Sequence, residues 1–533
     1  MARKSNNNHS ELLRELFQAA VQLRGSIEPS DYKKYVLPLV FLRFLSLRFD
    51  QRRGEIQTLL REPGSELYTT DPASVRETLE DPDEYRAAGV FMVPAKARWE
   101  YLRERARYDD IKVIVDNALQ AVEDAYPTEL KGLLPRVFAG SNLSRENVTG
   151  LINLFSKDVF RADHGGADLI GKVYEYFIGE FADSEGRRGG EYFTPVSIVR
   201  TLVRMLEPSP GDKVFDPCCG SGGMFVQSDI FTGRSHDLSF YGQESKEFTY
   251  QLCRMNLFIH GLGGAIELGN SYFNDLHPDL KADVVLANPP FNDGSKGENG
   301  WGADRIPDKD PRLVVNGRPM PLATRNANTL WMLHFLHHLA PGGAAGFVMA
   351  TGELSNRENA RLAVRKALVD GGYVDCIVQL TGQLFANTQI PCSLWFLSRN
   401  RDGSKSFRKR MDEILFIDAR KLGTLIPGSR KQKELSEEEV EHIAAVYREF
   451  KQTAAPEARP GFSAVASVED VRGHEYALTP GRYVGAEDVL EEEGAFEERF
   501  GELVERLERQ LQLAEILSGN IRRLLARMES GDS

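Results

Sequence analysis

The sequence predicts an α/β protein with a mostly parallel sheet, an all-helical domain before it and a long C-terminal helix. Three observations carry this prediction. Apolar residues recur every three or four positions through much of residues 10–165, as in amphipathic helices. From residue 166, short β-branched and aromatic runs alternate with helical patterns. Over residues 486–528 the helical spacing returns, among many Glu and Arg.

Residues 1–165 are predicted to form a helical domain without visible chemistry. The apolar side chains of residues 11–23 fall on one helical stripe. Ser30 and Asp31 are typical helix-start residues before a second apolar helix. Residues 111–125 predict a further helix.

Residues 166–425 are predicted to form the sheet domain. Helical patterns such as 248–260 and 328–339 separate strand-like runs, which favours a parallel sheet with helices on both faces. Such sheets bind ligands at the carboxyl ends of their strands. The expected strands are Lys213–Phe215, Leu238–Tyr241, Ala265–Leu268, Asp283–Ala287, Gly346–Ala350, Val374–Leu380 and Ser393–Ser398.

The remaining segments are predicted to be a loop, a linker and a tail that pairs with another helix. Residues 293–327 are rich in Gly, Pro and Asn, which predicts a long loop. Residues 426–480 predict a linker with a short helix at 436–449, and residues 481–533 predict a helical assembly tail. The tail's apolar stripe is long enough to pair with another helix. Packing of the tail against its own domain is an equal alternative.

Composition and charge restrict the function. Five cysteines without a CxxC pair argue against a disulfide framework or a structural zinc site, and favour a reducing cytoplasm. We expect no secretory signal and no membrane segment, because no early apolar stretch is long enough. The net charge of −12 repels a nucleic-acid backbone, so a partner is expected to supply much of any grip on DNA.

A glycine-rich turn, FDPCCGSGGMF at residues 215–225, follows the first predicted strand. Its glycines let a ligand approach backbone N–H groups. It lacks the lysine of a phosphate-binding loop and the spacing of dinucleotide folds, so the ligand need not carry phosphate. Glu244, at the tip of the next strand, could accept hydrogen bonds from both ribose hydroxyls. A plain structural turn and an exposed carboxylate are the alternatives.

The most specific feature is Asn288-Pro289-Pro290-Phe291, directly after the strand 283–287. The prolines fix a rigid turn and remove two backbone donors. The Asn288 side-chain oxygen and the Pro289 carbonyl remain as acceptors, beside the aromatic face of Phe291. They suit a planar ring amino group, whose two hydrogens meet the acceptors while the ring stacks on Phe291. A proline-rich strand cap would not explain the flanking Asn and Phe.

A third run, GEYFTP at residues 190–195, precedes the glycine turn. Alone it predicts a helix cap at Thr194, before the helix 198–205. In this order, GEYFTP, DPCCGSGG, an acid after the next strand and NPPF resemble the N6-adenine DNA methyltransferases, whose donor-binding motifs precede the catalytic one. The opening LLRELFQAAVQLRGSIEPSDYKKYVLPLVFLRFLS and the late YALTPGRYVG with its heptad-like tail resemble the modification subunit of type I restriction-modification systems.

The resemblance covers residues from about 10 to 527 and implies a Rossmann-like domain that transfers a methyl group from S-adenosylmethionine to adenine N6 in DNA. It implies that Glu244 binds the donor's ribose and that Asn270 lies beside its adenine. The catalytic loop would comprise Asn288, Pro289, Pro290 and Phe291. The other donor-binding residues would be Glu191, Tyr192, Phe193, Thr194, Pro195, Val196, Asp216, Gly220, Ser221, Gly222 and Gly223.

The resemblance also implies partners and leaves alternatives. The partners are double-stranded DNA, a separate specificity subunit, a second copy of the chain in a two-to-one assembly, and a restriction subunit. Alternatives are a stand-alone adenine DNA methyltransferase, a protein glutamine methyltransferase, whose similar turn usually continues with tyrosine, and a donor-binding scaffold that has lost transfer. Phe291 and the long helical N-terminus argue against the glutamine methyltransferase, and intact Asn288 and Phe291 argue against the scaffold.

Two features could carry unrelated chemistry. Cys218 and Cys219 stand where the family often has alanine, so a reactive thiol there is an open question. His334, His337 and His338 share a predicted helix at metal-like spacing, but no carboxylate accompanies them on it, so no metal is expected. Asp275 and Asp279 are expected to lie in a solvated loop.

Overall fold

The computed structural model describes two units of the chain. The first unit runs to Val484 and the second begins at Gly485. All helices and strands named below belong to the first unit. The described residues are 2–25, 27–160, 166–185, 194–294, 300–385, 389–403, 407–426, 429, 431–453, 456–485, 508–512 and 517.

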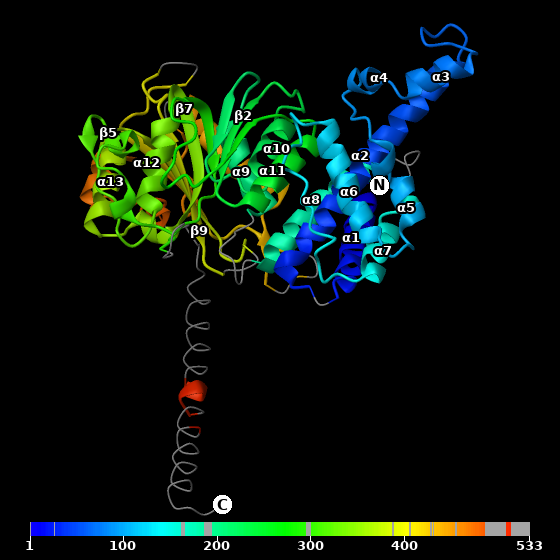
Figure 1. Cartoon of the computed structure of the whole chain (residues 1–533). Coiled ribbons are helices and arrows are strands. Elements are labelled where there is room, and N and C mark those ends of the chain that lie inside the picture. The colour runs from blue at the N-terminus through cyan, green and yellow to red at the C-terminus, as the bar shows by residue number, and fades with distance from the viewer. Residues whose placement is uncertain are drawn as a thin grey trace, which may run out of the picture. The chain divides into compact units, whose positions relative to one another are not determined.

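The N-terminal part of the first unit is helical, as predicted, and has its own apolar core. The long helix α2 packs along α8 (Figure 1). The Tyr32 hydroxyl on α2 donates to the Ala20 carbonyl of α1 at 2.6 Å, which fixes the start of α2. The helices are α1 (Ala2–Gln22), α2 (Pro29–Arg61), α3 (Pro72–Leu79), α4 (Pro82–Arg86), α5 (Trp99–Arg105), α6 (Ile111–Ala125), α7 (Arg145–Leu154) and α8 (Gly166–Glu185).

A nine-stranded sheet follows, with the order β13-β10-β8-β9-β7-β4-β1-β2-β3. Its strands pair in parallel except at β9 and β13, so the prediction of a mostly parallel sheet is confirmed. The strands are β1 (Lys213–Asp216), β2 (Ser239–Glu244), β3 (Ala265–Leu268), β4 (Ala282–Ala287), β7 (Leu339–Ala350), β8 (Val374–Leu380), β9 (Cys392–Ser398), β10 (Glu413–Ala419) and β13 (Ser463–Ser467).

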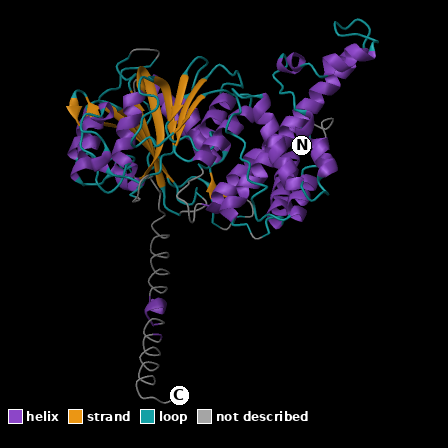
Figure 2. Cartoon of the chain, in the orientation of Figure 1, coloured by secondary structure: helices purple, strands orange, loops and turns teal. Residues whose placement is uncertain are grey.

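Helices cover both faces of this sheet (Figure 2). Successive strand residues alternate between the faces: Val284 and Leu286 join one core, and Val285 and Ala287 join the other. One face carries α9 (Val196–Leu206), α10 (Gly223–Phe231), α11 (Glu247–Ile259) and α14 (Glu437–Gln452). The other carries α12 (Asn328–His338), α13 (Asn359–Asp370) and α15 (Val468–Gly473). Short two-stranded ladders join β5 (Val314–Val315) to β6 (Arg318–Pro319) and β11 (Thr424–Leu425) to β12 (Lys433–Glu434).

The structure differs from the expected linker at residues 426–480. Helix α14 starts with a capping box formed by Ser436 and Glu439 and packs its apolar side against the sheet. Strand β13 pairs antiparallel with β10 and extends the sheet. The many charges of this stretch lie on the outer side of an amphipathic helix, so a charged composition here does not indicate a linker.

Two further expectations, the helical tail and the absence of a membrane segment, can be compared with the described residues only. The predicted tail at 481–533 lies mostly outside them; within it, residues 508–512 are helical. The long C-terminal helix therefore stays a prediction. Among the described residues, no helix is both long and apolar enough to cross a membrane.

A buried ion cluster joins β8 to α14 and to the segment before β10. Asp375 accepts hydrogen bonds from Arg410 Nε at 2.9 Å and Nη2 at 2.8 Å, and from the Tyr447 hydroxyl at 2.6 Å. Arg401 Nε lies 3.1 Å from the same carboxylate. Burial opposes ionisation, but the two guanidinium groups outweigh it and lower the pKa of Asp375. Asp375 is thus the shared counter-ion of two buried guanidinium groups.

We expect Asp375→Ala to destabilise the protein by about 3–5 kcal/mol, because it leaves buried guanidinium groups without their counter-ion. The measurement is urea unfolding of the full chain. Asp370→Ala is the control, because Asp370 holds Arg472 in an exposed ion pair that contributes little to stability. Equal, small effects of the two substitutions would contradict this role of Asp375.

Candidate functional site

The predicted motifs meet at one edge of the sheet. Strands β1, β2, β3 and β4 run parallel, with Asp216 paired to Gly242, Glu244 to Leu268 and Phe215 to Val285. Parallel strands end at the same edge. The residues that follow these strands are therefore neighbours in space although they are far apart in the sequence.

A cavity of about 850 Å³ opens at this edge. This volume lies within the range of roughly 300–1,000 Å³ that is usual for small-molecule sites. The predicted residues that line it are Thr194, Val196, Asp216, Gly220, Ser221, Gly223, Glu244, Asn270, Asn288, Pro290 and Phe291. Pro195, Gly222 and Pro289 are not among its lining residues. Glu191, Tyr192 and Phe193 lie outside the described residues.

The glycine turn holds its shape through left-handed backbone angles. Gly220 and Gly222 have φ values of 54° and 79°. A Cβ on Gly222 would lie 2.9 Å from Cys253 Sγ, so packing also requires glycine there. Glu244 is fixed beside the turn, because it accepts from Gly220 N at 3.1 Å and from Lys246 N at 2.9 Å.

The Asn288 side chain presents an unsatisfied acceptor. Its Nδ2 donates to Thr194 Oγ1 at 2.9 Å. Its Oδ1 is buried and has no hydrogen-bond partner in the part of the chain that the structure describes. Leaving such an atom unpaired costs about 1–3 kcal/mol. Because the residue Asn288 lines the cavity, an unpaired acceptor on its side chain points to a ligand that donates a hydrogen bond.

Thr194 differs from the expected helix cap. Helix α9 has Pro195 as its N-cap residue, without a side-chain cap. The Thr194 hydroxyl accepts from Asn288 instead, and so fixes which end of that amide remains open. No spacing in the sequence signals this contact, which joins residues 94 positions apart.

The turn after Asn288 is clamped by side chains that sequence reasoning missed. Asn292 has a left-handed φ of 58°, and its N–H donates to Asn328 Oδ1 at 2.7 Å. Asn328 Nδ2 in turn donates to Glu353 Oε1 at 2.7 Å. The Tyr272 hydroxyl donates to Asp293 Oδ2 at 2.7 Å. These bonds hold the turn in one conformation before any ligand arrives.

Two aromatic rings stand together at the cavity. Phe291 is half-buried, and its ring centroid lies 6.4 Å from that of Phe385 in an edge-on arrangement. Phe385 follows β8, whose carboxyl end lies at the same edge of the sheet. Phe385 is not itself among the lining residues of the cavity. Asn256 on α11 is an unpredicted lining residue; its Nδ2 donates to the Ser221 carbonyl at 2.9 Å.

The thiols beside the glycine turn are held protonated. Burial and the neighbouring Asp216 raise the pKa of Cys218 well above its usual value. A hydrogen bond with Cys253, together with burial, does the same for Cys219. A thiol is reactive as its thiolate. The structure therefore argues against a nucleophilic cysteine at this turn.

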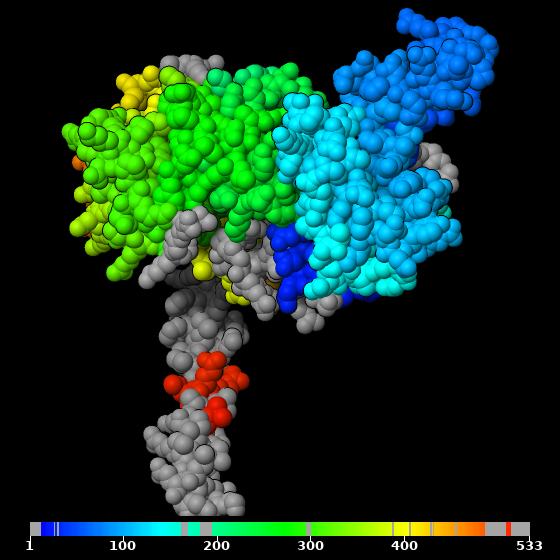
Figure 3. All heavy atoms as spheres, in the orientation of Figure 1, coloured from blue at the N-terminus to red at the C-terminus, as the bar shows by residue number. Residues whose placement is uncertain are grey.

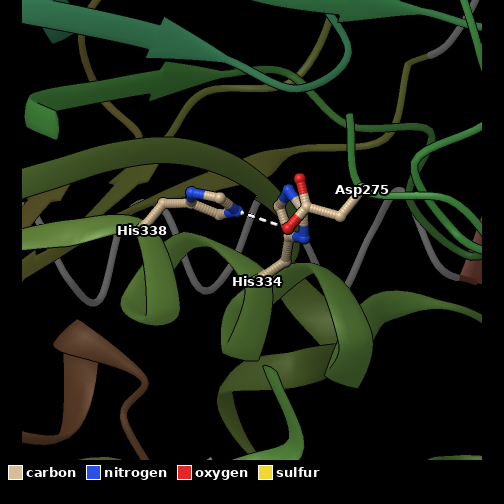
Figure 4. Close-up of side chains that lie close together, drawn as sticks. All are labelled: Asp275, His334 and His338. Carbon is tan, nitrogen blue, oxygen red and sulfur yellow. Dashed lines mark hydrogen bonds and ion pairs between the residues drawn. The ribbon is translucent and has the colours of Figure 1, made fainter. Parts of the chain in front are cut away.

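The three residues Asp275, His334 and His338 come together, with one ligand atom of each within 4.8 Å of the others (Figure 4). Asp275 is not solvated as expected, because the loop after β3 folds onto α12 and brings it 2.9 Å from His338 Nε2. His338 Nδ1 lies 3.0 Å from the Leu280 carbonyl.

The surroundings of His334 bear on whether this cluster could hold a metal ion, and the absence of a metal stays a prediction. Burial lowers the pKa of His334 well below its usual value, so the ring is neutral. Arg312 Nη1, which can only donate, lies 3.2 Å from His334 Nδ1, so the ring's own proton is on Nε2. A metal would need a lone pair at that nitrogen. The hydrogen bonds of the cluster join Asp275 to His338 and Arg312 to His334, whereas His334 Nε2 has no partner among the described residues.

Burial raises the pKa of Asp216 to about 7. The hydrogen bond from Cys218 N to this carboxylate lowers the pKa, but by less than burial raises it. The same carboxyl has a pKa of about 3.9 in an unfolded chain. As the pH rises from 4 to 7, the unfolded state loses its proton first, so the folded state loses relative stability. Above pH 7 this cost stays constant.

We expect Asp216→Asn, which cannot ionise, to gain stability over the wild type by about 2–3 kcal/mol between pH 5 and pH 8. Urea unfolding without ligands at both pH values measures it. Asp237→Asn is the control, because Asp237 is exposed in the turn before β2. Its free energy of unfolding should differ from that of the wild type by the same amount at pH 5 and at pH 8. A pH-independent difference for Asp216→Asn would show that its carboxyl is already ionised at pH 5.

Two family models match the chain. The model described as N-6 DNA Methylase matches residues 165–492, and the model described as HsdM N-terminal domain matches residues 12–155. The boundary between the two matches falls close to the start of α8.

Relatives and solved structures agree with these models. The MjaIX type I restriction enzyme methylase subunit of Methanocaldococcus jannaschii is 39% identical over 97% of this chain and 92% of its own length. The HindI methylase subunit of Haemophilus influenzae is 35% identical over 81% of this chain and 99% of its own. The crystal structure of a type I restriction-modification methyltransferase subunit from Streptococcus thermophilus has a TM-score of 0.72 and 25% identity, and covers 89% of this chain and 99% of that one. The chain therefore belongs to the N-6 DNA methylase family and is an adenine-specific DNA methyltransferase of the type I restriction-modification kind, a methylase subunit.

Proposed function

We propose that the cavity binds S-adenosylmethionine on its β1–β2–β3 side and the target adenine on its β4 side. Membership of the methyltransferase family implies S-adenosylmethionine as the donor. The single observation that carries the assignment of the adenine is the buried, unsatisfied Oδ1 of Asn288 in the cavity wall. An amino group is the part of adenine that can donate to it.

The residues of the donor side fit the proposed ligand. Glu244, fixed by Gly220 and Lys246, offers carboxylate oxygens to the two ribose hydroxyls. Asp216 and the glycine turn at 220–223 would surround the charged amino acid end. Asn270 would lie beside the adenine ring of the donor. The GEYFTP residues Glu191, Tyr192, Phe193, Thr194 and Pro195, with Val196, would contact its methionine end. Bound there, the donor supplies a methyl group already activated by its sulfonium charge.

On the substrate side, the turn holds the amino nitrogen of a flipped adenine. Asn288 Oδ1 and the Pro289 carbonyl accept its two hydrogens, which favours a pyramidal nitrogen with a free lone pair. Phe291 stacks on the ring and fixes its plane. Alignment of the reacting atoms can contribute about 7–11 kcal/mol, and a carbonyl or water takes the released proton. Removing the base from the duplex costs a few kcal/mol.

We expect Asn288→Ala to reduce methyl transfer by at least about 100-fold, in line with loss of a preorganised polar contact to the reacting group. Phe291→Ala should also reduce it strongly, because the base loses its stacking partner. Both variants should bind S-adenosylhomocysteine nearly as the wild type does. The measurements are labelled methyl transfer to DNA in the presence of the neighbouring specificity chain, nucleoside identification, and calorimetry.

Substitutions of Thr194 should reduce methyl transfer less than Asn288→Ala does. Thr194→Val removes the acceptor for Asn288 Nδ2 and should lower kcat by about threefold to tenfold, since one neutral hydrogen bond is lost. Thr194→Ser keeps the hydroxyl and should stay near wild type. Full activity of Asn288→Ala would overturn the catalytic assignment.

We infer that a separate specificity subunit directs this chain to DNA. The charge of −12 leaves the chain with little overall attraction for a duplex. A structural neighbour of 20% identity, described as showing complex assembly of the type I system, covers 98% of this chain with a TM-score of 0.58, which supports the fold. The proposed assembly has two copies of this chain and one specificity subunit on double-stranded DNA, and can add a restriction subunit. A cytoplasmic location fits this role.

Deleting residues 486–533 should weaken co-purification with the specificity subunit, because the predicted tail helix would pair with a partner helix. Donor binding by the first unit should stay unchanged, which serves as the control. Unchanged co-purification would favour the alternative that the tail packs against its own domain. DNA methylation by the purified chain alone would favour the stand-alone alternative, and methylation of a glutamine side chain would favour the protein methyltransferase.

A further inference from the structure

We propose that the N-terminal helical domain completes the donor pocket, with Lys33 of α2 hydrogen-bonded to the adenosine half of S-adenosylmethionine. The proposal rests on the assignment of the cavity to this donor. It gives the helical domain a direct part in cofactor binding, in addition to any part in assembly.

The first support is the wall of the cavity. One face of α2 contributes Lys33 and Leu37, and one face of α8 contributes Glu175, Ile178 and Phe181. Residues three or four apart lie on the same side of a helix, so each helix turns a whole face to the cavity. In Figure 3 the residues of the helical segment abut those of the sheet domain. The cavity therefore lies between the two domains of the first unit.

The second support is the burial of the Lys33 side chain. Lys33 is buried, with 8% of the residue exposed, and it lies in the wall of the cavity. Burial of an ammonium group is costly unless polar groups surround it. Lys33 has interactions of its own within the fold and also lines the cavity, so a bound polar ligand would add an acceptor to those that the ammonium group already has.

The third support is the position of the ammonium group along the sheet edge. Lys33 Nζ lies 5.4 Å from the ring centroid of Phe248, in the first turn of α11. Helix α11 begins three residues after Glu244, the proposed ribose ligand. The catalytic strand β4 is two strands away from β2, about 10 Å at the usual spacing. Lys33 is thus on the donor's side, where ribose oxygens and adenine ring nitrogens are acceptors.

The fourth support is that α2 is held in place by contacts with α1 and α11. The hydroxyl of Tyr32, the residue before Lys33, is bonded to α1, and the rings of Phe41 and Phe258 are 5.5 Å apart across α2 and α11. Leu252 and Met255 of α11 belong to the core of the helical domain. The position of Lys33 is therefore set by the same helix that follows the ribose ligand, so donor binding and the packing of the helical domain are coupled.

The test compares Lys33→Met with its neighbour Lys34→Met in the full chain. Calorimetry without DNA measures S-adenosylhomocysteine and 5′-methylthioadenosine, which keeps the adenosine half but lacks the amino acid. Lys33→Met should bind both ligands about 10- to 100-fold more weakly, as expected for loss of a charge-assisted hydrogen bond. Lys34→Met should bind them as wild type does, and Lys33→Arg should recover part of the affinity.

A second measurement does not depend on folding of a variant. Amide hydrogen exchange of the wild type should slow over residues 29–45 when S-adenosylhomocysteine is added. The proposal would be overturned if Lys33→Met bound both ligands with wild-type affinity, or if it lost affinity for S-adenosylhomocysteine alone. Unchanged amide exchange in α2 on addition of S-adenosylhomocysteine would also overturn it. A wild-type chain that binds neither ligand would overturn the donor assignment itself, which separates the two failures.

Discussion

The Thr194 hydroxyl holds the nitrogen end of the Asn288 amide, and the polarity of the proposed reaction centre follows from this hydrogen bond. An asparagine amide can present either a donor or an acceptor. With Nδ2 engaged, the oxygen is the end of the amide left without a partner among the described residues, and it is the end that an amino group requires. The clamp from Asn328, Glu353 and Tyr272 fixes the backbone of the same turn, so little reorganisation remains for the moment of binding.

The parallel sheet makes this arrangement possible because it collects short motifs at one edge. Strands of four to six residues end next to one another at β1, β2, β3 and β4, and each is followed by one functional segment. Alternating side chains join these strands to cores on both faces, so the edge is rigid. The glycine turn and Glu244 then form one bonded unit across neighbouring strands.

Sequence reasoning predicted the parts that depend on local chemistry. Helical spacing predicted α6 with its observed bounds, and the strands at 265–268 and 374–380 were predicted by their apolar runs. It did not predict β13 or the packing of α14, because their burial depends on contacts with β10 and the sheet. For the same reason it assigned Thr194 to a helix cap and missed Phe385 and Asn328. Contacts between distant residues leave no periodic signal.

The helical domain and the sheet domain are recognised by separate family models, yet the cavity has walls from both. This matters because the proposed assembly would place partner subunits against the same chain. A partner that moves α2 or α8 by a small amount would change the donor site, because packed cores do not deform continuously. A partner that altered donor binding in this way would itself be bound differently in the presence of the donor, as thermodynamic linkage requires.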